Sequence, residues 1–142
     1  MKPITTTKTS LDTNIVIYSH FLENKEKQAI SRDLLSKHPF VSIQVVSEYL
    51  NTMKRLLKSI ATKEDLMDLC SQWMLECMVQ PIHISTLQSA KRLINRYDFQ
   101  IFDSIIVASA LEAGCEVLYS EDMQHNLRVE KQLTIINPFI YK

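Results

Sequence analysis

The sequence predicts an α/β fold, a three-layer α/β/α sandwich in which a parallel sheet of about five strands lies between helices. Two observations support this fold class. Short apolar runs rich in β-branched residues recur along the chain, and helical patterns separate most of them. Strands that alternate with helices are joined by parallel crossovers and form a helix-covered sheet. The runs predicted as strands cover residues 7–11, 40–43, 79–83, 117–119 and 133–136.

The length of the chain and the absence of a low-complexity or linker segment predict a single domain spanning residues 1–142. A chain of 142 residues buries most of its apolar surface on folding and needs no disulfide bond or structural metal for stability. The three cysteines are odd in number and lack a C-x-x-C spacing, which argues against a disulfide framework and a zinc site. We therefore expect a reducing, cytoplasmic compartment. The start of the chain lacks a signal-peptide pattern, and no apolar stretch approaches the roughly 18 residues of a membrane span.

The composition also excludes several classes of function. Sixteen basic residues offset sixteen acidic ones, so any contact with nucleic acid must be local rather than a bulk electrostatic effect. Gly114 is the only glycine, whereas a Walker loop or a G-x-G-x-x-G turn needs several. No H-E-x-x-H or G-x-S-x-G motif is present, which leaves a zinc hydrolase and a serine triad without support.

The sequence predicts several helices and the residues at which some of them begin or end. Residues 104–113 are apolar almost all round, which predicts a central, buried helix. Gly114 directly follows this helix, at the C′ position where a residue with left-handed backbone conformation, usually glycine, commonly ends a helix. A second helix is expected at about 44–58, with an apolar stripe on one face. Two further amphipathic helices are predicted from the capping pairs Thr62 with Asp65 and Ser85 with Gln88.

Two aspartates follow predicted strands. Asp12 ends the first strand, and an isolated aspartate there is most simply a helix N-cap. Asp122 follows the strand at 117–119 and could be a solvated turn residue, and spacing alone does not separate it from Glu121. Open α/β sheets, however, bind ligands at the carboxyl ends of their strands. Both aspartates are therefore candidates for a site at that edge.

Two further acidic residues lie on predicted helices. Glu48 falls just beyond the border of the apolar stripe, where a solvated glutamate paired with Arg55 is the simple interpretation. Asp103 precedes the buried helix, and an N-cap role is about as probable as metal ligation. The two roles can coexist. At a border position, a helix can also turn a carboxylate toward a cleft beside the sheet.

Taken together, the four acidic residues predict a cation site. Carboxylates from distant parts of the chain that meet at one point repel each other, so at least one should have a raised pKa, and a hard divalent cation relieves this repulsion. The expected cofactor is Mg²⁺ or Mn²⁺, and the protein is expected to be a metal-dependent enzyme. The candidate catalytic and metal-binding residues are Asp12, Glu48, Asp103 and Asp122.

A family resemblance is carried by three segments: LDTN, QVVSEYLN and YDFQIFDSIIVASALEAGCEVLYSEDMQHN. Together they resemble a PIN domain of the bacterial VapC-like toxin type over essentially the whole chain. The resemblance implies a Mg²⁺- or Mn²⁺-dependent ribonuclease that is usually dimeric and often neutralised by a small antitoxin. It implies that the metal-binding carboxylates are the same four residues and that Asn14 and Ser120 are supporting polar residues of the site.

Two positions depart from the family pattern. Members of the family commonly carry glycine where this chain has Asp98 and Asn126. Aspartate and asparagine tolerate a positive φ better than other non-glycine residues. Both turns are therefore expected to survive at a modest cost.

The hypothesis is that the protein hydrolyses RNA phosphodiester bonds, as the toxin of a type II toxin–antitoxin pair. A cation lowers the pKa of a bound water, which attacks phosphorus in line. Asp12 and Asp103 are expected to be direct ligands, Asp122 a direct or water-mediated one, and Glu48 to orient the water. The residues expected to touch the substrate backbone are Asn51 and Arg55.

Two rival functions are compatible with the same pattern. One is a non-catalytic PIN-like module that binds RNA or protein; such a scaffold should gain little stability from Mn²⁺. The other is a phosphoacceptor receiver domain, which fits the sequence less well. Its site requires adjacent acidic residues after the first strand, whereas Asp12 has no acidic neighbour. An apolar surface for an antitoxin is expected on the helices at 45–57 and 66–78, although those side chains could serve the core equally well.

Overall fold

The computed structural model describes residues 7–21 and 23–140, which form an α/β fold around one sheet of six strands. The strand order is β3-β2-β1-β4-β6-β5, and only β5 runs antiparallel to its neighbour. The strands are β1 (Thr9–Leu11), β2 (Phe40–Ser42), β3 (Met78–Gln80), β4 (Val117–Tyr119), β5 (Arg128–Val129) and β6 (Leu133–Ile136). The fold class is confirmed, with one short strand more than expected.

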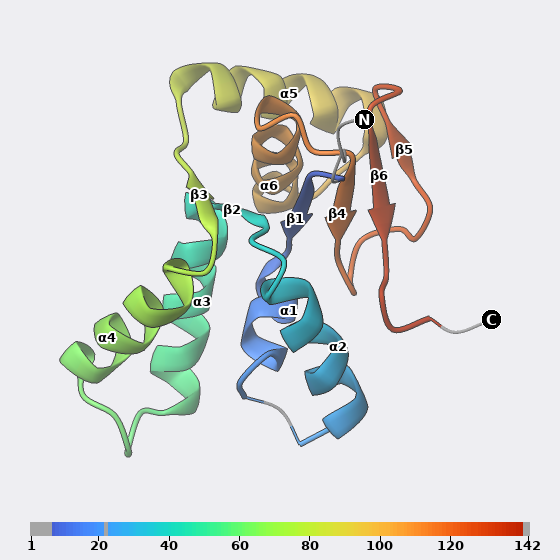
Figure 1. Cartoon of the computed structure of the whole chain (residues 1–142). Coiled ribbons are helices and arrows are strands. Elements are labelled where there is room, and N and C mark those ends of the chain that lie inside the picture. The colour runs from blue at the N-terminus through green and yellow to red at the C-terminus, as the bar shows by residue number, and fades with distance from the viewer. Residues whose placement is uncertain (1–6, 22, 141–142) are drawn as a thin grey trace, which may run out of the picture.

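Helices flank the sheet in two groups. Figure 1 shows α5 with α6 in the upper half and α1 to α4 in the lower half, while the sheet runs from β3 on the left to β5 on the right. α5 packs along α6, which contacts β2, and α3 contacts both α1 and α4. The helices are α1 (Thr13–Tyr18), α2 (Lys25–Leu35), α3 (Ile43–Leu56), α4 (Lys63–Met74), α5 (Ile84–Tyr97) and α6 (Ile101–Glu112).

The central helix α6 is buried, as its apolar sequence predicts. Every residue from 104 to 110 is buried. The two serines in that run have partners: the Ser104 hydroxyl donates to the Ile101 carbonyl oxygen at 2.5 Å, and the Ser109 and Ser42 hydroxyl oxygens lie 3.0 Å apart. Because its polar atoms are paired, α6 can pack inside the fold without a large desolvation cost.

The strand register places β1 in the middle of the sheet. Ser10 pairs with Phe40 of β2 on one side and with Leu118 of β4 on the other. Leu118 in turn pairs with Ile135 of β6. Leu11, Leu118 and Ile135 are fully buried. The carboxyl ends of β1 and β4 are therefore held side by side at the centre of the fold.

Two helix starts differ from their predicted positions. α6 begins at Ile101 with Gln100 as its N-cap residue, so Asp103 lies inside the first turn and the N-cap prediction is wrong. α5 begins at Ile84 rather than near Ser85. The predicted Ser85–Gln88 capping pair is also wrong, because the His83 backbone N–H donates to the Thr86 hydroxyl at 3.0 Å. The Thr62–Asp65 capping box of α4 is confirmed.

Other boundaries shift, and two elements were not predicted at all. The third strand ends at Gln80 rather than at residue 83. α2 was missed, although Asn24 caps it by accepting a hydrogen bond from the Lys27 N–H at 3.1 Å. β5 was missed because it is only two residues long and depends on pairing with β6. Within residues 7–21 and 23–140, no helix has both the length and the hydropathy needed to cross a bilayer.

The expected left-handed positions are confirmed. Gly114 has a φ of 78°, and Asp98 and Asn126, the two positions where the family resemblance leads one to expect glycine, have φ values of 59° and 67°. Asp98 ends α5 and redirects the chain into α6. Asn126 donates its backbone N–H to the Ile135 carbonyl oxygen at 2.7 Å. Both turns are thus made without glycine.

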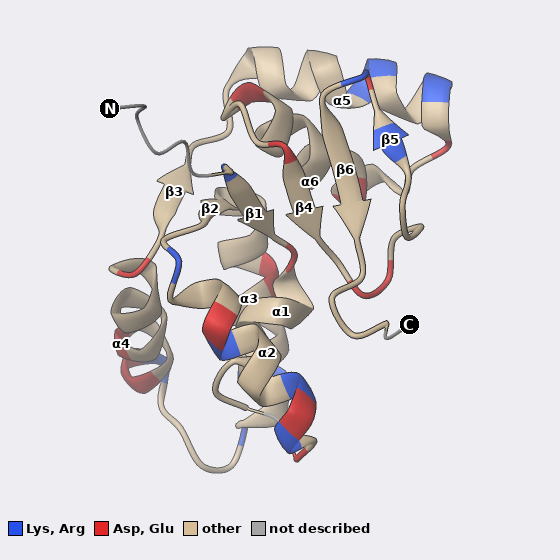
Figure 2. Ribbon diagram, turned by 45° about the vertical axis from the view of Figure 1, so that its right-hand side comes forward, with Lys and Arg blue, Asp and Glu red and all other residues tan. Residues whose placement is uncertain are grey.

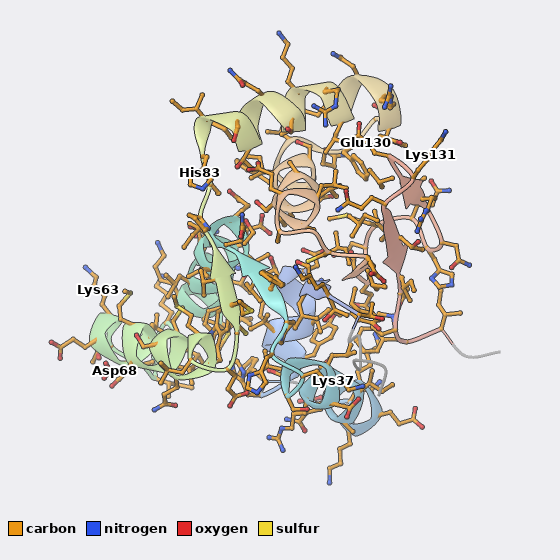
Figure 3. All side chains as sticks on the ribbon, turned by 45° about the horizontal axis from the view of Figure 1, so that its top comes forward. Lys37, Lys63, Asp68, His83, Glu130 and Lys131 are labelled. Atoms are coloured by element: carbon orange, nitrogen blue, oxygen red, sulfur yellow. The ribbon has the colours of Figure 1, made fainter. Side chains whose placement is uncertain are left out.

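The turn between β5 and β6 carries backbone strain. Glu130 and Lys131 have φ values of 50° and 59°, and the Gln132 N–H closes the turn on the Val129 carbonyl oxygen at 3.0 Å. A left-handed conformation costs a non-glycine residue roughly 1–2 kcal/mol. Glu130 offsets part of this cost through a bidentate ion pair with Arg92, with N–O distances of 2.8 and 3.0 Å. Figure 3 shows Lys131 at this turn, beside the end of α5.

Lys131→Gly is therefore expected to raise the free energy of unfolding by about 1 kcal/mol, because glycine adopts this conformation without the Cβ clash. Urea unfolding of the metal-free protein measures the change. Lys131→Ala is the matched control, since it removes the same side chain and keeps the strain; it should show no gain. Equal stability of the glycine and alanine variants would contradict the strain.

Candidate active site

Asp12 lies at the end of β1 and caps α1. Its Oδ1 accepts from the Thr13 backbone N–H at 2.8 Å, and its Oδ2 accepts from the Ser120 hydroxyl at 2.7 Å. The Asp12 N–H donates to the Tyr119 carbonyl oxygen at 2.9 Å. The predicted N-cap role is confirmed, and the side chain is only 7% exposed. The carboxylate is thus held by the first turn of α1 and by the residue that follows β4.

Glu48 faces Asp12 from α3. Its Oε1 accepts from the Thr13 hydroxyl at 2.9 Å, and its Oε2 accepts from the Gln44 amide at 2.9 Å. No ion pair links Glu48 to Arg55 in the part of the chain that the structure describes, so the pairing expected from the sequence is wrong. The carboxylate of Glu48 is therefore bound by Thr13 and Gln44.

Asp103 projects from the first turn of α6. It is half-buried, and burial together with the charges of Glu48 and Asp122 raises its pKa above the usual value. Gln100, rather than Asp103, precedes the helix. Asp103 is therefore not a capping residue, and its negative charge lies among the other acidic groups.

Asp122 and Glu121, which spacing does not separate, have different partners. Asp122 Oδ2 accepts from the Asn14 amide at 2.9 Å. Glu121 accepts from the Tyr18 hydroxyl at 2.6 Å and forms an ion pair with Lys27. Because Lys27 already neutralises Glu121, the carboxylate of this loop that has no ion-pair partner among the described residues is that of Asp122. This arrangement favours Asp122 as the site residue.

A side-chain cluster anchors the loop after β4. The Lys27 ammonium lies 5.5 Å from the Tyr18 ring centroid and 5.2 Å from that of Phe139. Burial, followed by the hydrogen bond to Glu121 and the charge of that residue, raises the pKa of Tyr18. This cluster ties α1, α2 and the C-terminal segment to the loop that carries Asp122. Sequence reasoning missed Lys27, Tyr18 and Thr13, because a lysine or tyrosine at helical spacing has no distinctive signal.

The electrostatics of the acidic cluster are unfavourable without a counter-ion. Burial raises the pKa of Asp12 from 3.8 to about 6, although hydrogen bonds from Ser120 and Thr13 lower it, and the charges of Asp103 and Glu48 raise it further. Figure 2 shows acidic positions at the junction of β1 with α1 and in the loop that follows β4. Four carboxyl groups thus interact at the carboxyl edge of the parallel sheet.

The chemistry of these groups fits a hard divalent cation, since all four offer carboxylate oxygens. Nevertheless, among the described residues no three acidic, histidine or cysteine side chains converge closely enough to hold a metal ion as they stand. Hydrogen bonds from Asn14, Thr13 and Gln44 occupy oxygens of two of the carboxylates, Asp122 and Glu48. A bound cation would require these side chains to reorient, which the loss of repulsion would favour.

The two residues predicted to touch substrate lie on the same helix as Glu48. Asn51 and Arg55 follow it by three and seven positions in α3, and both are exposed. At 3.6 residues per turn, these spacings place them on one side of the helix. The structure gives neither residue a partner within the acidic cluster.

Two cavities differ in their relation to the cluster. One of about 180 Å³ contains Asp103 in its wall, between the end of α5 and the loop after β4. A larger one of about 430 Å³ lies between α1, α2 and α4 and is lined by residues such as His20, Arg32 and Trp73. None of the four carboxylates lines the larger cavity. Only the smaller one adjoins the acidic cluster.

The fold and the site define a class of protein: an α/β domain with four interacting carboxyl groups at the carboxyl edge of its sheet. The chain belongs to the PIN-domain family, whose model matches residues 10–129. This match agrees with the resemblance carried by the sequence motifs. PIN domains are typically nucleases and generally bind divalent metals. No curated protein matches the chain significantly.

Several solved structures share the fold. A toxin–antitoxin complex from Klebsiella pneumoniae aligns with a TM-score of 0.68 and 16% identity, covering 93% of this chain and 98% of that one. VapBC2 from Rickettsia felis, bound to a promoter DNA fragment, aligns with a TM-score of 0.67 and 16% identity over 92% and 100%. Mycobacterium tuberculosis VapC20, a toxin that cleaves the Sarcin-Ricin loop, gives 0.63 and 14% over 81% and 90%.

Proposed function

We propose that this chain is a Mg²⁺- or Mn²⁺-dependent ribonuclease and the toxin of a type II toxin–antitoxin pair. The observation that carries the proposal is the meeting of Asp12, Glu48, Asp103 and Asp122 at one sheet edge, where the pKa of Asp12 rises to about 6. Buried carboxyl groups that repel each other are unfavourable unless a cation compensates them. The fold shared with VapC20 supports RNA as the substrate class.

In this proposal the protein's residues hold and orient the reactants. A divalent cation, when bound, supplies electrophilic stabilisation of the phosphate and an acidified water. Asp12 is fixed by Ser120 and Thr13, so it presents its carboxylate in one orientation. Asp103 and Asp122 would complete the ligand set, Asn14 holds Asp122, and Glu48 would accept a hydrogen bond from a water at the site.

Substrate binding is assigned to the exposed face of α3 beyond Glu48. Arg55 can pair with a backbone phosphate and Asn51 can donate to a phosphate or ribose oxygen. Local contacts of this kind are required because the chain has no net charge to attract a polyanion. Because a single cationic side chain, Arg55, is assigned to a phosphate, binding should depend only weakly on salt.

Partners follow from the same comparison. The similar structures include toxin–antitoxin complexes, and we propose a small antitoxin as the partner of this chain in the cytoplasm, where its RNA substrate would be found. Three exposed apolar side chains are available for it: Leu56 of α3, Met67 of α4 and Leu75, which directly follows α4. A homodimer is also proposed; the exposed Ile84, Ile101 and Phe102 offer apolar surface for a second copy.

The test is cleavage of a mixed cellular RNA pool by the purified protein, freed of any co-purifying partner. We expect discrete products in Mn²⁺ and none in EDTA, and a rise in the melting temperature with Mn²⁺ that follows its binding constant. Asp103→Asn should lose both effects. No cleavage together with no thermal shift would instead favour a PIN-like module that binds RNA or protein without cutting it.

A further inference from the structure

We propose that the cavity of about 180 Å³ beside Asp103 is a subsite for one unpaired nucleobase, and that it prefers a base with an exocyclic amino group over uracil. This inference rests on the proposed function, since it places the base next to the bond to be cut. The cavity is formed by the α5–α6 junction and the loop after β4; its wall includes Tyr97, Phe99, Gln100, Asp103, Gln124 and Leu127.

The size and shape of the cavity limit the occupant. Pockets for drug-sized ligands enclose about 300–1,000 Å³, and this one encloses about 180 Å³, so a single flat ring system is the expected occupant. Two aromatic side chains contribute to its wall: the Tyr97 and Phe99 rings lie 5.8 Å apart, inclined by 39°. Every nucleobase can stack on such a side chain, and stacking is the main way proteins hold unpaired bases.

The aromatic wall is already held in place. The Tyr97 hydroxyl accepts from the Glu130 backbone N–H at 2.8 Å, which fixes the ring against the β5–β6 turn. Asp98, in the left-handed conformation, turns the chain so that Phe99 follows at the cavity. A ring held before binding loses little conformational entropy when a base stacks on it.

The polar groups of the wall select against phosphate and for an amino group. None of the lining residues that the structure describes is lysine or arginine, and two of them, Asp98 and Asp103, are acidic. A phosphate would be repelled, whereas a neutral base with an exocyclic N–H₂ can donate to a carboxylate or an amide oxygen. Uracil carries the carbonyl oxygen O4 where cytosine carries its N–H₂, so a carboxylate at that position meets an acceptor instead of a donor.

Two glutamines of the wall, Gln100 and Gln124, have no side-chain hydrogen bond within the part of the chain that the structure describes and can therefore contact the base edge. Gln100 precedes α6, yet its side chain makes no capping hydrogen bond. Gln124 is exposed and contributes to the same wall. A side-chain amide offers both a donor and an acceptor, so it can pair with the edge of any base. The preference for an N–H₂ group comes from the two carboxylates of the wall, Asp98 and Asp103. The subsite would therefore read one nucleotide beside the scissile phosphate.

The experiment sequences the products that the wild-type protein generates from single-stranded RNA of random sequence in Mn²⁺. We expect uracil to be depleted at one position flanking the cut. Phe99→Leu should lower kcat/KM about tenfold on the preferred sequence, the loss expected for one stacked base. Asp98→Asn removes a carboxylate of the wall, keeps a residue that tolerates the positive φ, and should bring the ratio of cytosine to uracil at that position toward 1. Asp68→Asn, at an exposed position of α4 outside the cavity, is the matched control.

Binding of short oligonucleotides of a single base type, with Ca²⁺ in place of Mn²⁺, separates the two proposals. Cleavage with the same base profile in every variant would overturn the subsite and leave the nuclease standing. Absence of cleavage, with tighter binding of oligo(C) than oligo(U) that Phe99→Leu abolishes, would keep the subsite and overturn the nuclease. Neither cleavage nor base-dependent binding would overturn both. The Mn²⁺-dependent thermal shift should be unchanged in Phe99→Leu.

Discussion

Asp103→Asn is expected to lower the rate of RNA cleavage by more than about 100-fold, since changing even an outer residue of a metal site costs about 10–100-fold in affinity or activity. Asparagine keeps the size of the side chain and removes the charge that would attract the cation. Asp103 is half-buried and interacts with the charges of Glu48 and Asp122. The measurement is single-turnover cleavage at saturating Mn²⁺, alongside circular dichroism to verify the fold.

Asp68→Asn is the matched control for this variant. Asp68 is an exposed residue of α4, and Figure 3 shows it on the outer side of that helix, away from the sheet. The same chemical change there should leave the cleavage rate within about twofold of the wild type, since surface substitutions away from special features have effects of about ±0.5 kcal/mol. A folded Asp103→Asn protein that cleaves at the wild-type rate would overturn the assignment.

The stability of the metal-free protein should fall as the pH rises from about 4 to about 6. Asp12 has an unfolded pKa near 3.8 and a folded pKa of about 6. Between these values the folded state retains a proton that the unfolded state has lost, so the slope of stability against pH is negative. The accumulated loss is on the order of 3 kcal/mol above pH 6. The raised pKa of Asp103 acts in the same direction.

Asp12→Asn should abolish the loss of stability that the ionisation of Asp12 causes, so a comparison with the wild type measures the contribution of this residue alone. Asparagine can still accept from the Thr13 N–H, and its NH₂ group can donate to the Ser120 hydroxyl. The variant should therefore be more stable than the wild type at pH 7.5 in EDTA, and about equal to it near pH 4. Chemical denaturation at several pH values measures the difference between the two proteins. That difference cancels the contributions that act in the opposite direction. His20 makes one of them, since burial and Arg32 lower its pKa. The carboxyl groups whose pKa values are lowered make the others: Asp65, Glu121 and Glu130.

A wild-type protein that is as stable as Asp12→Asn at pH 7.5 in EDTA would contradict the buried charge. Saturating Mn²⁺ should raise the stability of the wild type and leave that of Asp12→Asn nearly unchanged, because only the ionised carboxylate attracts the cation. The two substitutions together thus separate catalysis from folding. Asp12 is expected to be costly for the metal-free fold and necessary for activity.

Local patterns in the sequence predict the framework of this fold well. β4 and β6 have the predicted bounds, and the buried helix is recognised from its apolar residues on every side. Such features depend on the periodicity of neighbouring residues, which the sequence carries directly. Helix starts were less predictable. Gln100 rather than Asp103 precedes α6, because a start also depends on how the chain arrives from the preceding turn at Asp98.

The four acidic positions could likewise be named from the sequence, since parallel strands bring their carboxyl ends to one edge. Their partners could not. Which of Glu121 and Asp122 is free depends on Lys27, which reaches the loop from α2, 94 positions earlier in the chain. Glu48 turns to Thr13 and Gln44 rather than to Arg55 for the same kind of reason.

The sequence by itself therefore determined the fold class, the buried helix and the set of acidic residues. The tertiary structure decided how each carboxylate is held, which one is neutralised by lysine, and that an aromatic cavity adjoins Asp103. The physical reason is the range of the interactions. Periodicity and capping act over a few residues, whereas hydrogen bonds, ion pairs and burial join side chains whose distance in sequence carries no information about their distance in space.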